Sequence, residues 1–400
     1  MNICIVSMAN AHDKQIGGKH IHQLLLEKAY CEQGHNVITV YPGKKKIISR
    51  IVLKINRSLS KESNAKKFIT HCTEIRKELT NMIIKILRRS KDEIVFLSQD
   101  TISALAVKDA LSLYQYDNVH TALTLHGYFT REELNYQNFD KDREHFIMIS
   151  IGWEREAVMY VDKILTVDTR IRNYVIDELK VDPSKISVIY NSINDSLFRP
   201  ANKDEVKHLR KKHNLPIDKN IILVARRLVK KNGVHQALYA MEQIDESFNV
   251  LMVVIGDGPE RDNLLKIISE KKLEKKVLFL GEIKHSQIVD YYRLADIILL
   301  PSTKSDNVEE ATSLSMLEGM ACGKVVIVSA IGGMKEVIKD NVNGYLFEDK
   351  NIPDLVKKIK LAIINKNESE RISNIAREYV VANNGYLEHA NRYLSYACGK

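Results

Sequence analysis

Residues 297–323 have the sequence IILLPSTKSDNVEEATSLSMLEGMACG, in which a short apolar run leads into a stretch that carries three glutamates, of which Glu310 and Glu318 have seven residues between them. The four aliphatic residues are typical of a strand buried in a parallel sheet. The later part favours a helix, in which eight residues at 1.5 Å each place the two carboxylates about 12 Å apart. Open α/β sheets bind ligands at the carboxyl ends of their strands. The pattern therefore predicts that the two acids hold two ends of one extended ligand.

Strand and helix patterns alternate along the rest of the chain. A helical pattern at 21–33 ends at Gly34, and a polar break at 191–202 divides two series of candidate strands: 3–8, 37–40, 94–98, 121–125, 163–167 and 186–189, then 221–225, 250–255, 277–280, 297–300 and 325–329. Such an alternation predicts an α/β fold with parallel sheets covered by helices on both faces.

The chain length predicts two domains. Four hundred residues are too many for one ordinary core. We expect two doubly wound, Rossmann-like domains, one of residues 1–198 joined by a C-terminal helix at 385–400, the other of residues 199–384. A ligand would lie in the cleft between them.

Charge and composition restrict the class of protein. The net charge of +9 and the pI near 9.0 favour an acidic partner, for which nucleic acid, anionic lipid and a phosphorylated substrate all qualify. No apolar run reaches the ~18 residues that a membrane helix needs, and the first residues do not resemble a signal peptide. The five cysteines are scattered without metal-ligand spacing, which favours reduced thiols. We therefore expect a cytoplasmic protein.

Short motifs follow one another in a fixed order along nearly the whole chain. The second half carries ARRLVKKNG (225–233), IGDGPER (255–261), FLGE (279–282), ADII (295–298), the paired acids, GGMKEV (332–337) and NGYL (343–346). The first half carries GG (17–18), GHNV (34–37), LHG (125–127) and VIYN (188–191). This series resembles the retaining glycosyltransferases of family 4. The resemblance implies the GT-B fold and a nucleotide-sugar donor, whose base would lie at the turn of Glu282 and Ile283.

Breaking a nucleotide-sugar bond builds negative charge on the diphosphate leaving group, which preorganised cations and N–H groups can stabilise. The candidates are Arg227 and Lys231, supported by the amides of Ala311, Thr312 and Ser313 at a helix N-terminus. The arginine–lysine spacing is shifted by one residue from the family pattern, so Arg226 is an alternative to Arg227.

The resemblance implies further roles at the donor. Glu310 would bind the hydroxyls of the donor sugar and Glu318 the ribose, while His126 would face the transferred sugar. Gly18 would let the backbone approach the reaction centre, and Gly256 would lie against the donor. The family's usual Gly-Phe-Gly after the first acid is replaced here by residues 311–313, which is expected to alter sugar selectivity.

Each of these positions also has a purely structural interpretation. Two glutamates on a helix usually form a solvated face, although the apolar neighbours of Glu318 favour burial and function. The basic residues at 226–231 could be surface charge. Gly256 could serve only a tight turn, His126 could simply be packed, and Gly18 could serve only its own loop.

Neither a metal nor a cofactor is expected. Asp140-Lys141-Asp142 has the spacing of an Asp-X-Asp metal motif, but it lies in a polar stretch with no strand before it, which favours a solvated loop. His20 and His22 lack further nearby ligands. The resemblance thus implies metal-independent transfer with retention, from a UDP-sugar by family frequency, to a glycan, lipid-linked or small-molecule acceptor in surface glycan or glycolipid synthesis. The alternatives are a GT-B sugar-nucleotide epimerase and a non-catalytic basic scaffold that binds membrane or nucleic acid.

A basic amphipathic pattern at 44–61 suggests an anionic membrane surface as a further partner. Aliphatic residues recur there at helical spacing between lysines and arginines, as in helices that lie in the lipid interface. The alternative is an ordinary helix that packs its apolar stripe on the domain core. Nucleic acid is not expected as a partner, because residues 44–91 contain Phe68 as their only aromatic residue and single-strand binders interleave stacking rings.

Overall fold

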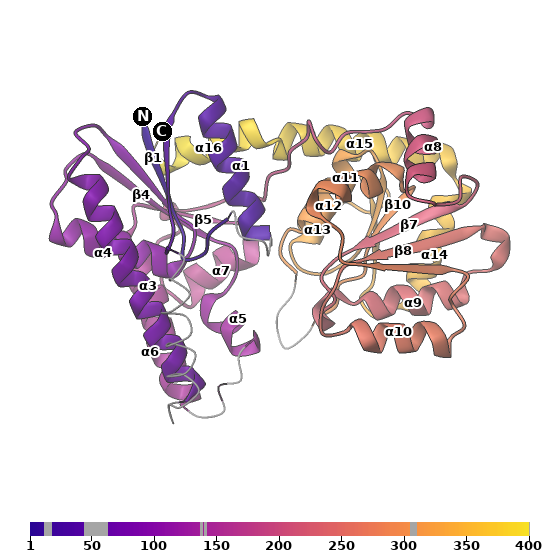
Figure 1. Cartoon of the computed structure of the whole chain (residues 1–400), viewed down its shortest axis with the longest axis horizontal. Helices are drawn as coiled ribbons and strands as arrows, with labels where there is room; N and C mark the ends of the chain where they lie inside the picture. Colours follow the sequence, from indigo (N-terminus) through magenta and orange to yellow (C-terminus); the bar gives the residue numbers. More distant parts are fainter. Residues whose placement is uncertain (12–17, 44–62, 137–138, 140–141, 305–309, 400) are drawn as a thin grey trace. The chain divides into compact units, whose positions relative to one another are not determined.

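The computed structural model describes residues 1–11, 18–43, 63–136, 139, 142–304 and 310–399. These residues form two compact units (Figure 1). The first unit consists of Met1–Tyr190 and His389–Lys400, and the second of Asn191–Glu388. The chain therefore changes unit a few residues before the predicted boundary at 198 and a few residues after the one at 384.

The first unit contains a six-stranded parallel sheet of order β2-β1-β3-β4-β5-β6. Its strands are β1 (Asn2–Val6), β2 (Asn36–Val40), β3 (Ile94–Ser98), β4 (Val119–Leu125), β5 (Lys163–Thr166) and β6 (Ile186–Val188). Its helices are α1 (Gly18–Glu32), α3 (Asn64–Leu87), α4 (Thr101–Leu113), α5 (Phe129–Tyr136), α6 (Arg143–Tyr160), α7 (Thr169–Asp177) and most of α16 (Tyr386–Ala397).

The second unit repeats this architecture with the strand order β12-β11-β10-β7-β8-β9, again all parallel. Its strands are β7 (Asn220–Ala225), β8 (Val250–Ile255), β9 (Val277–Gly281), β10 (Ile297–Leu300), β11 (Val325–Ser329) and β12 (Tyr345–Phe347). Its helices are α8 (Lys203–Lys212), α9 (Val234–Gln243), α10 (Arg261–Glu270), α11 (His285–Leu294), α12 (Leu314–Ala321), α13 (Met334–Val337), α14 (Ile352–Ile364) and α15 (Lys366–Asn384).

The predicted α/β fold and its strands are confirmed. Every residue of β8 and of β10 is buried, as expected for strands covered on both faces. Alternate residues of the second sheet, such as Ile222, Val224 and Met252, share one core with α9, α10 and α14. Gly34 ends α1 with φ +78°, as its place after the helical pattern predicts. The sequence did not indicate β12, because three residues are too few to show a period.

Each sheet has one topological switch point. There, successive strands stop being added on one side of the first strand and continue on its other side. It lies between β1 and β3 in the first unit and between β7 and β10 in the second. Loops from two neighbouring strands leave in opposite directions there and open a crevice at the carboxyl ends. The stretch at 297–323 begins with β10, one of the two strands that border the switch point of the second unit.

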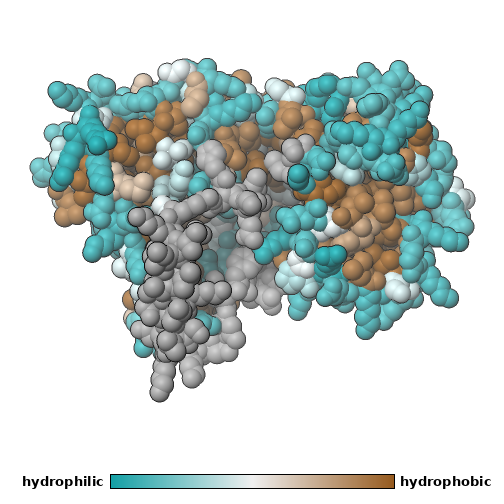
Figure 2. Space-filling model, in the orientation of Figure 1, coloured by the Kyte–Doolittle hydropathy of each residue, from teal (hydrophilic) through white to brown (hydrophobic). Residues whose placement is uncertain are grey.

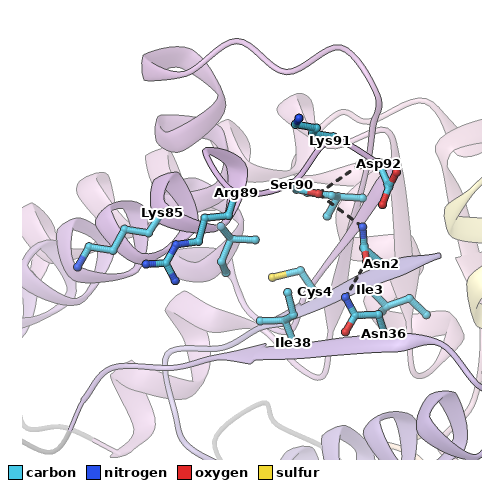
Figure 3. A pocket seen from close by; sticks show the side chains of 12 residues that line it. Asn2, Ile3, Cys4, Asn36, Ile38, Lys85, Arg89, Ser90, Lys91 and Asp92 are labelled. Atoms are coloured by element: carbon cyan, nitrogen blue, oxygen red, sulfur yellow. Dashed lines mark hydrogen bonds between the residues drawn. The ribbon is translucent and has the colours of Figure 1, made fainter.

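A pocket of about 670 Å³ lies at the amino ends of β1, β2 and β3 in the first unit, the end of the sheet opposite to the carboxyl ends of the strands (Figure 3). Asn2 begins β1 and Asn36 begins β2, while Arg89 and Lys91 follow the end of α3. None of the predicted site residues lines this pocket. It is therefore distinct from the carboxyl-end crevice in which such folds bind ligands.

The segment 44–61, proposed to form a basic amphipathic helix, lies outside the described residues, as do Asp140 and Lys141. On the face drawn in Figure 2, hydrophilic residues are interspersed with apolar ones. Within the described parts of the chain, no helix has the length and apolar character to cross a membrane.

Candidate active site

Arg226 forms the centre of the candidate site at the switch point of the second unit. It follows the last residue of β7. Its Nη1 donates a hydrogen bond to Oγ of Ser302, which lies just beyond β10, and its Nη2 lies 3.1 Å from Oε1 of Glu310. The side chains of Arg226 and Glu310 are only 5% and 17% exposed, so this ion pair is shielded from solvent. Side chains from two strand ends and one loop thus meet at the place where this fold binds ligands.

The structure distinguishes between the two arginines. Arg227, the predicted cation, has an exposed side chain, whereas Arg226 turns inward to Glu310. Successive residues of an extended chain point to opposite sides, so only one of the pair can reach Glu310. The arginine that contacts Glu310 is therefore Arg226, which the shifted spacing gave as the alternative to Arg227.

Two glycines allow the backbone of the loop after β8 to approach the loop after β7 closely. Gly256 has φ +140°, and a Cβ there would lie 1.9 Å from the carbonyl oxygen of Arg226. Gly258 has φ +155°, and its Cβ would lie 2.4 Å from the carbonyl oxygen of Leu228. The Arg226 amide in turn donates to Ile255 O at 2.9 Å. Gly256 is thus required for the backbone geometry that positions Arg226, whether or not it contacts a ligand.

Lys231 lies on a short 3₁₀ turn that packs against the loop after β10. Its carbonyl oxygen accepts a hydrogen bond of 2.8 Å from the Thr303 amide. The following Gly233 has φ +61°, and a Cβ there would lie 1.9 Å from the carbonyl oxygen of Pro301. This close approach fixes the backbone of Lys231 beside the loop that carries Ser302. Lys231 and Arg226, the alternative to the predicted Arg227, therefore flank the same strand end.

Residues 311–313 lead into α12, whose first turn faces the same loops. Thr312 and Ser313 are buried, and the Thr312 carbonyl oxygen accepts from Asn191 Nδ2 at 2.9 Å. Ser313 is the N-cap residue of α12, yet its side chain makes no capping hydrogen bond with the described residues. The Glu310 carbonyl oxygen accepts from the Gly333 amide at 3.0 Å. Hydrogen bonds thus hold the backbone on both sides of Ala311 while the helix begins without a side-chain cap.

Glu318 is buried on α12, as its apolar neighbours predict. Burial raises the pKa of this carboxyl to about 7, and a hydrogen bond with Tyr292 opposes that rise. Gly319 brings α12 close to the sheet, since a Cβ there would lie 2.8 Å from Ile298. A carboxyl group inside such a core is costly unless it has a polar partner.

Glu282 and Ile283 follow β9, which is separated from β7 by β8. Glu282 is exposed and Ile283 is half-buried. Two strand spacings place this turn roughly 10 Å from the end of β7. The Gly281 carbonyl oxygen accepts from the Gly256 amide at 2.8 Å, so the turn is tied to the loop that positions Arg226.

His126 and Gly18 belong to the first unit. His126 follows β4, and its Nε2 lies 3.2 Å from Oε1 of Gln99, which follows β3. Its ring also meets His22 edge-on at 4.8 Å between centroids. Burial holds the pKa of His126 well below its ordinary value, so the ring is neutral and can accept or donate a hydrogen bond. Gly18 is exposed and begins α1.

Sequence reasoning assigned no role to two residues that neighbour the candidate site residues, Ser302 and Tyr292. Ser302 could have been found, because it directly follows β10 and the rule that led to Glu310 applies equally to it. Tyr292 carries no local signal, since it lies on a different helix, α11, from the glutamate that it contacts.

The described part of the chain contains no group of three or more His, Cys, Asp or Glu side chains that could hold a metal ion. Asp142 begins α6 and accepts a hydrogen bond of 2.7 Å from Ser63 Oγ. That contact gives Asp142 a structural partner in Ser63, the N-cap residue of α3.

Comparison with known proteins identifies the family of this chain. The model "Glycosyltransferase Family 4" matches residues 16–197, and "Glycosyl transferases group 1" matches residues 205–379. The uncharacterized glycosyltransferase MJ1607 of Methanocaldococcus jannaschii is 32% identical over 195 residues, or 48% of each chain. The N-acetyl-alpha-D-glucosaminyl L-malate synthase of Bacillus anthracis is 30% identical over 185 residues, or 46% of each chain. The chain therefore aligns with about half the length of these two relatives.

A solved structure extends the likeness to the complete fold. Anabaena Alr3699/HepE, in complex with UDP, matches with a TM-score of 0.74 at 16% identity, and the match covers 100% of both chains. Together the two family models leave only short segments of the chain unmatched. The chain belongs to the glycosyltransferases of family 4, and its two α/β units form the GT-B fold.

Proposed function

We propose that this protein transfers a sugar from a nucleotide-sugar donor to an acceptor hydroxyl. The observation that carries the proposal is the shielded contact of Arg226 with Glu310 and Ser302 at the switch point of the second unit. A guanidinium has five N–H donors, so Arg226 can orient Glu310 and still donate to a phosphate oxygen. Family membership favours transfer over the alternatives of an epimerase and a scaffold.

In the proposed donor site, different elements around Arg226 would bind different parts of the nucleotide-sugar. The diphosphate would be stabilised by Arg226, by Lys231 and by the amides that begin α12, because negative charge develops there as the sugar departs. Glu310 would accept hydrogen bonds from sugar hydroxyls and Glu318 from the ribose. The base would lie at the turn of residues 282–283, whose distance from β7 suits a nucleoside.

UDP is the nucleotide that we propose, since a protein of the same fold has been solved with UDP. We further propose that the sugar is transferred with retention and without a bound metal, the charge of the diphosphate being balanced by protein cations. In the first unit, His126 would bind the transferred sugar as a neutral ring.

Release of nucleoside diphosphate from a panel of UDP-, GDP- and ADP-sugars tests this function. We expect release with at least one UDP-sugar, and NMR of the product should show the donor's anomeric configuration. Arg227→Ala should resemble the wild type, whereas Arg226→Ala should lose turnover. Absence of turnover and of nucleotide binding with every donor would refute the proposal.

The acceptor is proposed to lie at an anionic membrane surface on the cytoplasmic side, contacted by residues 44–61. Each basic residue near such a surface contributes about 1 kcal/mol. Co-sedimentation should show binding to phosphatidylglycerol vesicles that weakens with salt and with serine substitutions at Lys44, Lys45, Lys46 and Arg50. Equal, salt-insensitive binding to neutral and anionic vesicles would instead favour a soluble acceptor.

A further inference from the structure

Gln99 is a buried glutamine at the topological switch point of the first unit. It directly follows β3, and its backbone amide donates a hydrogen bond of 2.9 Å to the carbonyl oxygen of Val6, which ends β1. The next residue, Asp100, caps the N-terminus of α4, where its Oδ1 accepts from the Ser103 amide at 2.8 Å. These hydrogen bonds fix the backbone at Gln99, which is only 1% exposed.

The side-chain amide of Gln99 lies between a backbone carbonyl group and the ring of His126. Its Nε2 donates a hydrogen bond of 3.4 Å to the Leu97 carbonyl oxygen, and its Oε1 lies 3.2 Å from Nε2 of His126. A carbonyl oxygen can only accept a hydrogen bond. The nitrogen of the Gln99 amide must therefore face Leu97, which leaves its oxygen to face His126.

This orientation of the amide determines which nitrogen of His126 carries the proton. A neutral imidazole has one N–H donor, and its other nitrogen is an acceptor. Burial keeps His126 neutral, because it holds the pKa of the ring well below its ordinary value. Since Oε1 of Gln99 can only accept, the hydrogen bond between the two side chains requires a proton on Nε2 of His126. Nδ1 then keeps its lone pair and is an acceptor.

His22 contacts the same ring without fixing its protonation. The two rings meet edge-on, with 4.8 Å between centroids and 75° between planes. His22 is fully buried, and neither of its ring nitrogens has a hydrogen-bond partner among the residues that the structure describes. The contact is therefore one of packing, which restricts rotation of the His126 ring. The hydrogen bond that selects between its two nitrogens comes from Gln99.

We propose that Gln99 is a positioning residue of the sugar site, which holds His126 as the tautomer protonated on Nε2, so that Nδ1 can accept a hydrogen bond from a hydroxyl of the transferred sugar. This inference rests on the proposed function, because it assumes that His126 binds that sugar. Gln99 acts through His126 and need not touch the donor.

Nitrogen NMR of the histidine rings tests the tautomer directly. The chain has 13 histidines, so the signals of His126 are identified by their loss in His126→Asn. In the wild type at neutral pH, we expect Nε2 to be protonated, with its proton protected from exchange with water, and Nδ1 to be unprotonated. Gln99→Met removes the acceptor at similar size and should give the averaged signals of two exchanging tautomers.

Gln23→Met is the matched control for this substitution. Gln23 is another buried glutamine of the first unit, but its Nε2 donates to Ser7 Oγ at 3.0 Å. The control variant should therefore leave the His126 signals unchanged.

Kinetics tests the connection with the donor. Gln99→Met should lower kcat/KM for the nucleotide-sugar roughly tenfold, the effect of one lost hydrogen bond. It should leave the affinity for UDP unchanged, because UDP lacks the sugar that His126 would bind.

Several outcomes would overturn the proposal. A protonated Nδ1 in wild-type His126, or an Nε2 proton that exchanges freely with water, would refute it even if Gln99→Met does not fold. Unchanged His126 signals in folded Gln99→Met, or an equal change in Gln23→Met, would show that Gln99 only packs. A loss of UDP affinity as large as the loss of kcat/KM would show a general structural effect. Wild-type protein that turns over no nucleotide-sugar would instead refute the proposed function, while the NMR signals would still decide the role of Gln99.

Discussion

Replacement of Arg226 should disable the site while leaving the fold in place. Its guanidinium contacts both Ser302 and Glu310, and its side chain is only 5% exposed. A preorganised charged donor of this kind contributes about 10²–10³ to turnover, or about 2.7–4 kcal/mol. Arg226→Ala should therefore lower turnover by about that factor. Arg226→Lys should recover part of it, since lysine keeps the charge but loses the planar fork.

The same substitution should have a smaller effect on stability. Arg226→Ala leaves the Glu310 carboxylate and the Ser302 hydroxyl without this donor, which costs about 1–3 kcal/mol for a buried group. Glu310 retains access to water through its 17% exposure, so the lower part of that range is expected. Thermal unfolding measures this loss of stability, whereas release of nucleoside diphosphate measures turnover.

Arg227→Ala is the matched control, because it removes an arginine one residue away whose side chain is exposed. It should keep turnover within a few-fold of the wild type. The reasoning would be wrong if Arg227→Ala lost as much turnover as Arg226→Ala. It would also be wrong if folded Arg226→Ala retained near-normal turnover.

Three further predictions concern the donor site. Glu318→Gln should weaken the binding of both UDP and intact donor, whereas Glu310→Gln should spare UDP affinity and lower sugar transfer. An equal loss of UDP affinity in both variants would contradict this division of roles. Activity should survive excess EDTA, since the diphosphate charge is assigned to protein cations, and loss that magnesium or manganese restores would show a metal requirement. Gly256→Ala should destabilise the fold by about 2–4 kcal/mol, because its Cβ would lie 1.9 Å from Arg226 O. An unchanged unfolding midpoint would show that the two loops can separate at little cost.

The sequence by itself determined the alternation of strands and helices and the family. Strands such as β8 and β10 are uninterrupted apolar runs because they are covered on both faces, and that pattern is local. The burial of Glu318 could also be predicted, because its apolar neighbours on the same helix lie within one turn of it.

Tertiary structure decided which polar groups meet. The residue types at 226 and 227 are identical, and only the direction in which the chain leaves β7 turns Arg226 toward Glu310. The partner of Glu318 is Tyr292, on another helix, so no spacing within α12 could reveal it. The need for glycine at 256 arises from a carbonyl group about 30 residues away. Such contacts form between segments distant in the chain, where periodicity and propensity carry no information.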